Sequence, residues 1–230
     1  RFESRGLGDV YKRQPENASK VKIEAVKSYG GDVVFCEPTI SAREMKVQEL
    51  IDEYKYTFIH PFDDYSVIAG QGSIACELES QLQEPLDKLL IPVGGGGLIS
   101  GISFFAKKNG GIASTIIGAE PETARDATDS FYSKTHVTDY KPMTIADGLR
   151  ATLGVKNFEI ILKNVDEFIT ATESEIIAAM KIIWSRLKVI VEPSAAVPLA
   201  VILNKPEYFK NERVGVILSG GNLDLEDLPW

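Results

Sequence analysis

The chain contains few of the residues on which disulfide-stabilised and metal-stabilised proteins depend. Only two cysteines and two histidines occur among its 230 residues. Cys36 and Cys76 have no partner nearby in sequence, which excludes a disulfide framework and a zinc signature. We interpret both as small buried hydrophobes. His60 and His136 also lack a neighbouring base, nucleophile or metal ligand in the sequence, so we assign neither to catalysis.

Long apolar runs and an excess of positive charge are also missing. No apolar run approaches the roughly 20 residues of a membrane span, and no secretory signal opens the chain. The formal net charge is −8, which argues against nucleic acid or an anionic membrane surface as a partner, because both attract basic patches. Hydrophobic residues make up 44% of the chain, enough for a core. These features predict a cytoplasmic enzyme or enzyme fragment with neither partner.

Segments with helix and strand patterns alternate along the chain. The patterns predict helices over residues 18–29, 41–55, 66–82, 98–108 and 174–187, and strands over residues 32–35, 57–59, 89–93, 115–119 and 214–218. Such alternation predicts an α/β fold in which a mostly parallel sheet is flanked by helices on both faces.

Four consecutive glycines form the most informative motif of the sequence. Gly94, Gly95, Gly96 and Gly97 follow a short apolar strand and precede a predicted helix. Because glycines carry no side chains, several backbone N–H groups in such a turn can converge on one anion. The helix that follows adds its unpaired N–H groups and the positive end of its dipole. The motif therefore predicts a phosphate-binding loop.

The residues alone leave open which phosphate this loop holds. A P-loop is excluded because no Lys-Ser or Lys-Thr pair follows the glycines. Gly95 and Gly97 partly match a Rossmann fingerprint, with Ser100 in place of its third glycine. Glu120 ends the next predicted strand, where an acid that binds ribose would stand. A nicotinamide dinucleotide-dependent dehydrogenase is therefore an alternative, although the second glycine cluster, at residues 214–222, is no part of that fingerprint.

A series of motifs occurs in the order found in one enzyme family. They are AVKSYGGDVVF (25–35), HPFDD (60–64), VIAGQGS (67–73), GGGG (94–97), EP (120–121), TIADGL (144–149), EPSAA (192–196) and LSGGN (218–222). This order resembles the fold-type II pyridoxal phosphate enzymes, and within them the serine racemase and serine/threonine dehydratase group. The resemblance runs from Pro15 to Leu223. It implies a tryptophan synthase β-like α/β fold with a large domain and part of a small domain.

The resemblance implies a cofactor, pyridoxal 5′-phosphate, and residues that hold it. The glycine loop would bind the phosphate, the backbone of Gly148 would lie beside the ring, Glu192 would lie near the cofactor, and the Ser219 hydroxyl would meet the pyridine nitrogen. A neutral hydroxyl does not favour a protonated pyridine, which suits elimination and proton exchange better than transamination. Without the resemblance, Ser219 is as well explained by capping a turn, and Glu192 by a solvated loop.

Two acids in the segment GAEPETARD form a second candidate site. Glu120 and Asp126 flank a short loop that contains Ala124. Mg²⁺ and Ca²⁺ prefer oxygen ligands from carboxylates, backbone carbonyls and waters. By spacing alone, two unrelated acids around a turn remain the alternative. The family resemblance implies a structural Mg²⁺ or Ca²⁺ bound by Glu120, the Ala124 carbonyl and Asp126.

Two motifs of the family have no counterpart in the sequence. These are the segment with the Schiff-base lysine and the Ser-rich, Asn-containing loop that grips the substrate carboxylate, so we expect no catalytic residue in this chain and no turnover by it. Residues 1–14 match nothing in the family, and we interpret them as a translation scar. Residues 15–63 are then predicted to be part of the small domain, and residues 64–230 to be the large, cofactor-binding domain.

For the full-length parent, the resemblance implies racemisation of serine, or β-elimination of L-serine or L-threonine to a 2-oxo acid and ammonia. The substrate would be a small amino acid, the parent would be a homodimer, and a nucleotide would be a candidate effector. A non-catalytic pseudoenzyme that binds pyridoxal phosphate remains an alternative, beside the dehydrogenase.

Overall fold

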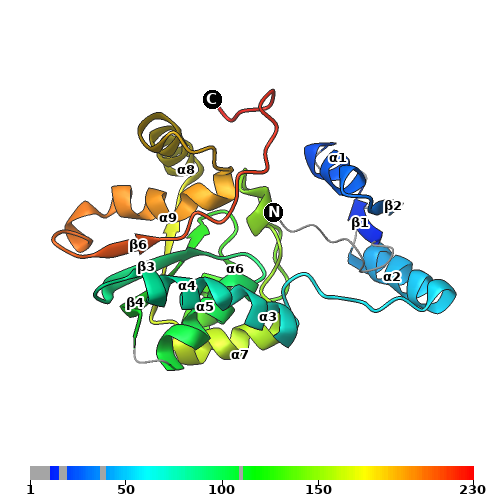
Figure 1. Ribbon diagram of the computed structural model, residues 1–230, viewed down its shortest axis with the longest axis horizontal. Coiled ribbons are helices and arrows are strands. Elements are labelled where there is room, and N and C mark those ends of the chain that lie inside the picture. Colours follow the sequence, from blue (N-terminus) through cyan, green and yellow to red (C-terminus); the bar gives the residue numbers. More distant parts are fainter. Residues whose placement is uncertain (1–10, 16–19, 37–39, 109–110) are drawn as a thin grey trace. The chain divides into compact units, whose positions relative to one another are not determined.

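The computed structural model describes residues 11–15, 20–36, 40–108 and 111–230 (Figure 1). These residues form two compact units. The smaller unit consists of the described residues up to Ile59 and of Asn222–Leu228, and the larger of His60–Gly221 and Pro229–Trp230.

The smaller unit is a parallel strand–helix–strand motif followed by a helix. Its elements are β1 (Tyr11–Pro15), α1 (Lys20–Ser28), β2 (Asp32–Cys36) and α2 (Ile40–Tyr54). The two strands pair in parallel, with Tyr11 opposite Asp32. The two predicted helices and the strand over 32–35 are confirmed. The strand predicted over 57–59 is wrong, because this segment is irregular. The domain boundary predicted after residue 14 falls inside β1.

The larger unit is built on a parallel sheet. In the described residues its strands are β3 (Leu86–Pro92), β4 (Ala113–Pro121), β5 (Glu167–Ala171) and β6 (Val214–Val216), in the spatial order β5-β4-β3-β6. Leu90 of the central strand β3 lies opposite both Ile117 and Val216. Strands covered on both faces read as continuous apolar runs, and Leu89, Leu90 and Ile91 are fully buried.

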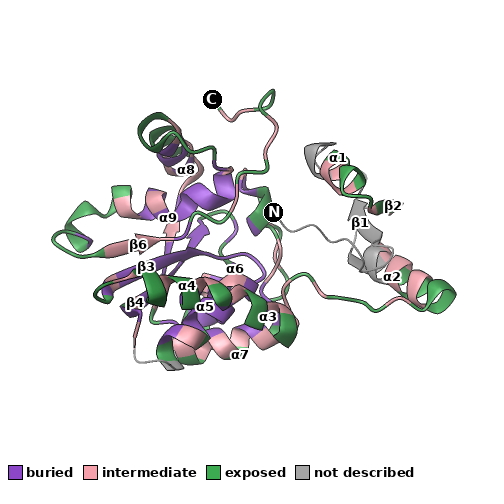
Figure 2. Ribbon diagram, viewed as in Figure 1, coloured by how far each residue is buried: buried purple, intermediate pink, exposed green. Residues whose placement is uncertain are grey.

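Helices cover both faces of this sheet (Figure 1). They are α3 (Tyr65–Gln71), α4 (Ser73–Gln81), α5 (Gly97–Lys108), α6 (Asp126–Ser133), α7 (Val155–Asn164), α8 (Glu173–Ile182) and α9 (Pro193–Asn204). Helix α9 packs on β3, β4 and β5, and α8 packs on α9; α5 contacts the strands too, with α3, α4 and α7 packed against it. Strands β3 and β4 and helices α5 and α9 are the most deeply buried elements, whereas β6 is half-buried (Figure 2).

Several sequence predictions for the larger unit need correction. The single helix predicted over 66–82 is two helices, α3 and α4, separated at Gly72. The helix predicted over 174–187 becomes a π-helical turn, Ile183–Leu187, after α8. Cys76 is exposed on α4 and Cys36 is only half-buried, so neither is the buried hydrophobe that we expected. Within the described ranges, no helix has both the length and the apolar character that crossing a bilayer requires.

Candidate functional site

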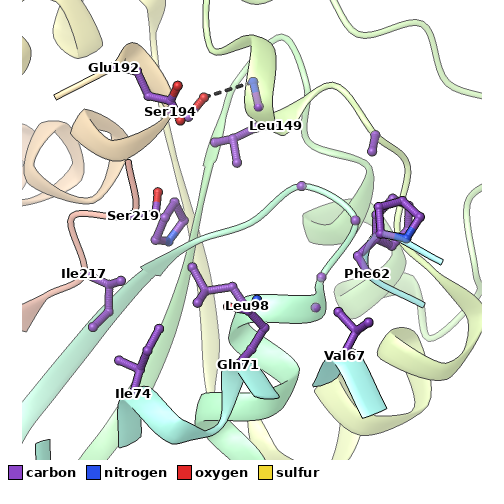
Figure 3. A pocket seen from close by; sticks show the side chains of 18 of the residues that line it. Phe62, Val67, Gln71, Ile74, Leu98, Leu149, Glu192, Ser194, Ile217 and Ser219 are labelled. Atoms are coloured by element: carbon purple, nitrogen blue, oxygen red, sulfur yellow. Dashed lines mark hydrogen bonds between the residues drawn. The ribbon is translucent and has the colours of Figure 1, made fainter. Parts of the chain in front are cut away.

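A cavity of about 660 Å³ opens at the carboxyl ends of β3 and β6 (Figure 3). Strand β3 leads into the glycine loop, and its neighbours β4 and β6 lie on opposite sides of it. The chain therefore winds in both directions from β3, and in open α/β sheets ligands bind at such a switch point. The predicted cofactor residues Gly94, Gly95, Gly96, Gly97, Gly148, Glu192 and Ser219 all line this one cavity.

The glycine loop leaves no room for side chains. A Cβ on Gly94 would lie 2.9 Å from the Cα of Leu149, and a Cβ on Gly95 would overlap the ring of Phe62. Gly96 has a φ of +88°, a conformation that favours glycine. Helix α5 begins at Gly97, and its first N–H groups have no partner within the helix. This arrangement is suited to an anion such as a phosphate.

Polar groups lie across the cavity from the glycine loop (Figure 3). Ser219 follows β6, and Glu192 stands at the N-cap of α9. The N–H of Gly148 donates a hydrogen bond of 3.1 Å to the Ser194 hydroxyl, which fixes the loop beside it. The backbone N–H of Glu192 donates to the Gly220 carbonyl at 3.0 Å. Loops from three parts of the chain are thus fastened together around the cavity.

Sequence reasoning missed Phe62 and Ser194 as residues of this site, although both stand in motifs that it singled out. The ring of Phe62 lies against Gly95 and forms the side of the cavity opposite Ser219 (Figure 3). Ser194, in EPSAA, is buried and holds Gly148. The signal was present in the motifs, but only the tertiary structure shows which of their residues face the cavity.

Glu120 and Asp126 lie away from this cavity, around the start of α6. The fully buried Glu120 carboxylate accepts hydrogen bonds from the Thr128 N–H (2.7 Å), the Thr128 hydroxyl (2.6 Å) and the Ala127 N–H (3.2 Å). The Asp126 carboxylate accepts from the Leu153 N–H at 2.7 Å. No cluster of three or more His, Cys, Asp and Glu side chains suited to a metal occurs in the described residues.

This placement corrects the dinucleotide interpretation of Glu120. An acid that binds ribose must reach the ligand held by the glycine loop. The Glu120 carboxylate instead faces the first turn of α6 and does not line the cavity. A nicotinamide dinucleotide-dependent dehydrogenase is therefore not favoured.

Burial changes the protonation of both acids. It raises the pKa of Glu120 to about 8, with a further contribution from the nearby negative charge of Asp126, against which the hydrogen bonds from Thr128 and Ala127 act. Burial also raises the pKa of Asp126, which the hydrogen bond from Leu153 opposes. A buried pair of acids of this kind is stabilised either by protons or by a cation.

The raised pKa of Glu120 makes stability depend on pH. In chelator-containing buffer, the folded protein keeps its proton up to about pH 8, whereas an unfolded chain loses it near its ordinary pKa of 4.5. The free energy of unfolding should therefore fall between these values, by at most about 1.4 kcal/mol per pH unit. Denaturant unfolding of the protein and of Glu120→Gln across this range measures the effect. A wild-type slope equal to that of Glu120→Gln would contradict it, and the exposed Glu122→Gln serves as control.

Comparisons with known proteins identify the family of the chain. The family model described as "Pyridoxal-phosphate dependent enzyme" matches residues 5–220. A beta-hydroxyaspartate dehydratase from Paracoccus denitrificans (strain Pd 1222) is 44% identical over 94% of this chain and 68% of its own length. A serine racemase from Dictyostelium discoideum is 46% identical over 93% of this chain and 67% of its own length.

Solved structures of related enzymes share the fold. The crystal structure of a serine racemase from Dictyostelium discoideum superposes with a TM-score of 0.85 at 43% identity, covering 94% of this chain and 70% of that one. The crystal structure of a T.th. threonine deaminase gives 0.88 at 34% identity, covering 94% and 71%. The predicted fold-type II α/β architecture is confirmed. With its glycine loop, its cavity at the strand ends and these matches, the chain belongs to the family of pyridoxal-phosphate dependent enzymes.

Proposed function

We propose that this chain is the cofactor-binding part of an enzyme that racemises serine or eliminates the β-hydroxyl of L-serine or L-threonine, giving a 2-oxo acid and ammonia. The observation that carries the proposal is the single cavity shared by the glycine loop and Ser219. The relatives support it, since their names combine racemisation, dehydration and deamination of amino acids.

The residues of the cavity divide the work of holding the cofactor. The N–H groups of the glycine loop would bind its phosphate, and Gly148, held by Ser194, leaves space beside the ring. Pyridoxal phosphate, when bound, stabilises negative charge at the α-carbon of an amino acid. The Ser219 hydroxyl would hydrogen-bond the pyridine nitrogen without protonating it, which restrains that charge stabilisation. The site then favours loss of a β-hydroxyl or return of the proton.

The relatives point to a small β-hydroxy amino acid as substrate. Serine carries a hydroxyl on its β-carbon, as does the β-hydroxyaspartate named for the Paracoccus relative. The hydroxyl on the β-carbon is the group that an elimination removes. A homodimeric parent, a nucleotide effector and a cytoplasmic location remain predictions from the family resemblance, as does the absence of the Schiff-base lysine from this chain.

A ligand titration tests this function. Adding pyridoxal 5′-phosphate should quench the intrinsic fluorescence of the purified chain, whereas NADH at the same concentration should leave that fluorescence unchanged. No lysine lines the cavity in the described residues, so borohydride reduction followed by mass spectrometry should find no single lysine stoichiometrically modified by the cofactor. Joined to the upstream segment of its parent, the chain should release pyruvate from L-serine or form D-serine. Binding of NADH in place of pyridoxal phosphate would refute the proposal.

We also propose a divalent cation, Mg²⁺ or Ca²⁺, at Glu120, the Ala124 carbonyl and Asp126. Both carboxylates are buried, and burial disfavours their negative charge and raises the pKa of each. A hard cation bound between them would neutralise that charge. The support is the chemistry of these donors and their place around one loop.

Thermal unfolding tests the cation site. Millimolar Mg²⁺ or Ca²⁺ should raise the Tm of the chelated protein by mass action. Asp126→Asn and Glu120→Gln should lose most of this response. Asp129→Asn, in the same helix but in a half-exposed ion pair with Arg125, should keep it. A Tm that does not respond to either metal in the unmodified chain would show the cation assignment to be wrong.

A further inference from the structure

The N-terminus of α7 is fastened to the back of the glycine loop. The side-chain amide of Asn157 donates two hydrogen bonds, one to the Gly95 carbonyl (2.8 Å) and one to the Phe62 carbonyl (2.9 Å). The Gly154 N–H donates to the same Gly95 carbonyl at 3.1 Å. One carbonyl of the loop is therefore held from behind by two donors of α7 and its N-cap.

These bonds set the direction of the peptide between Gly95 and Gly96. In a trans peptide the carbonyl oxygen and the following N–H point to opposite sides. Because the Gly95 carbonyl points to Asn157, the Gly96 N–H points away from α7. Gly96 lines the cavity and Asn157 does not. Asn157 thus helps to present an N–H group on the side of the loop where an anion would bind.

The hydrogen bond from the Asn157 amide to the Phe62 carbonyl holds the neighbouring wall of the cavity. Phe62 lies against Gly95, and its carbonyl is fixed by Asn157. The next residue, Asp63, accepts hydrogen bonds from the backbone N–H groups of Lys156 (3.0 Å) and Asn157 (3.3 Å) at the start of α7. The segment that carries Phe62 is therefore attached to the same helix turn as the glycine loop.

The amide is retained at a cost. Asn157 is fully buried, and its side-chain oxygen has no hydrogen-bond partner in the part of the chain that the structure describes. An unsatisfied buried acceptor is unfavourable, and an apolar side chain of similar volume would avoid it. The two carbonyls held by the nitrogen explain why an amide stands at this position.

We infer that Asn157 is a positioning residue of the phosphate-binding loop: it acts through Gly95 and Phe62 and sets the affinity for the phosphate of the ligand. This inference rests on the proposed function, since it takes pyridoxal phosphate as the ligand of the cavity. It assigns a role to α7, which contributes no side chain to the cavity lining.

The test compares two ligands on matched variants of the whole chain. Asn157→Leu removes both hydrogen bonds. Asn164→Leu is the control, because it removes an amide from the other end of α7, where it donates to the Ile160 carbonyl at 2.8 Å. Pyridoxal 5′-phosphate and pyridoxal are titrated by fluorescence, and the Tm of each variant is recorded. Asn157→Ala is the second variant in case leucine overpacks the site.

We expect Asn157→Leu to weaken pyridoxal 5′-phosphate binding about tenfold, the loss expected for one to two hydrogen bonds, and to change pyridoxal binding much less. Asn164→Leu should alter neither. The inference would be overturned if Asn157→Leu lost equal affinity for both ligands or kept its affinity for pyridoxal 5′-phosphate. It would also be overturned if neither Asn157 variant folded, which would leave Asn157 a structural residue. If the unmodified chain does not bind pyridoxal 5′-phosphate, the proposed function itself fails; an Asn157 variant that binds normally removes only this inference.

Discussion

Gly96→Val is expected to abolish binding of pyridoxal 5′-phosphate, lowering affinity by at least about 100-fold, or about 2.7 kcal/mol. The residue has a φ of +88°, which a β-branched side chain strongly disfavours. Its Cβ would lie 2.5 Å from Leu153 Cδ1 and 2.9 Å from Asn157 Cβ. The loop would have to move away from α7, and its N–H groups would no longer converge. Fluorescence titration with the cofactor measures the loss.

Gly111→Val separates backbone strain from the effect on the site. Gly111 also has a positive φ, +100°, but a Cβ there meets nothing within 4 Å. Its valine variant should lose some stability and retain cofactor binding. Retained binding in Gly96→Val, at a Tm similar to that of Gly111→Val, would contradict the assignment of the glycine loop as the phosphate site.

Gly101→Ala is expected to cost about 1–3 kcal/mol of stability, the usual range for overpacking, or more. Gly101 lies in α5 where this helix passes α3. A Cβ there would overlap the Ile68 carbonyl and lie 2.6 Å from the Gly72 nitrogen, and both are backbone atoms that cannot turn aside. The helices would have to separate, and α3 carries Val67 and Gln71 of the cavity wall. Urea unfolding measures the loss.

Gly70→Ala is the matched control for this substitution. Gly70 lies in α3, is exposed, and has open space where a Cβ would stand. Alanine should be neutral or stabilising there, because it lowers the entropy of the unfolded chain. If the two alanine variants unfold at the same urea concentration, the close approach of α3 and α5 at Gly101 is not a constraint on the fold.

A local pattern was enough to predict some elements but not others: the amphipathic helix α7 and the strand β5 were both missed. The strand over 89–93 and the helix over 98–108 were recognised because an apolar run, a glycine turn and an apolar helix follow one another. Helix α9 was missed because it is apolar on nearly all sides and contains Pro198, so it shows no helical period. The apolar segment 57–59 resembled a strand but is irregular in the structure, since a local pattern does not supply a partner strand.

The sequence by itself determined the α/β class and, through its ordered motifs, the enzyme family, and it predicted the phosphate-binding loop. These depend on local features: glycines between a strand and a helix, and short segments that keep their order. Only the tertiary structure decided that Phe62 and Ser194 belong to the cavity, that Glu120 faces α6 and not the cavity, and that Asn157 holds the loop from the side of α7. Those relations join residues far apart in the chain, and they arise because the parallel strands end at one edge of the sheet and the helices pack around it.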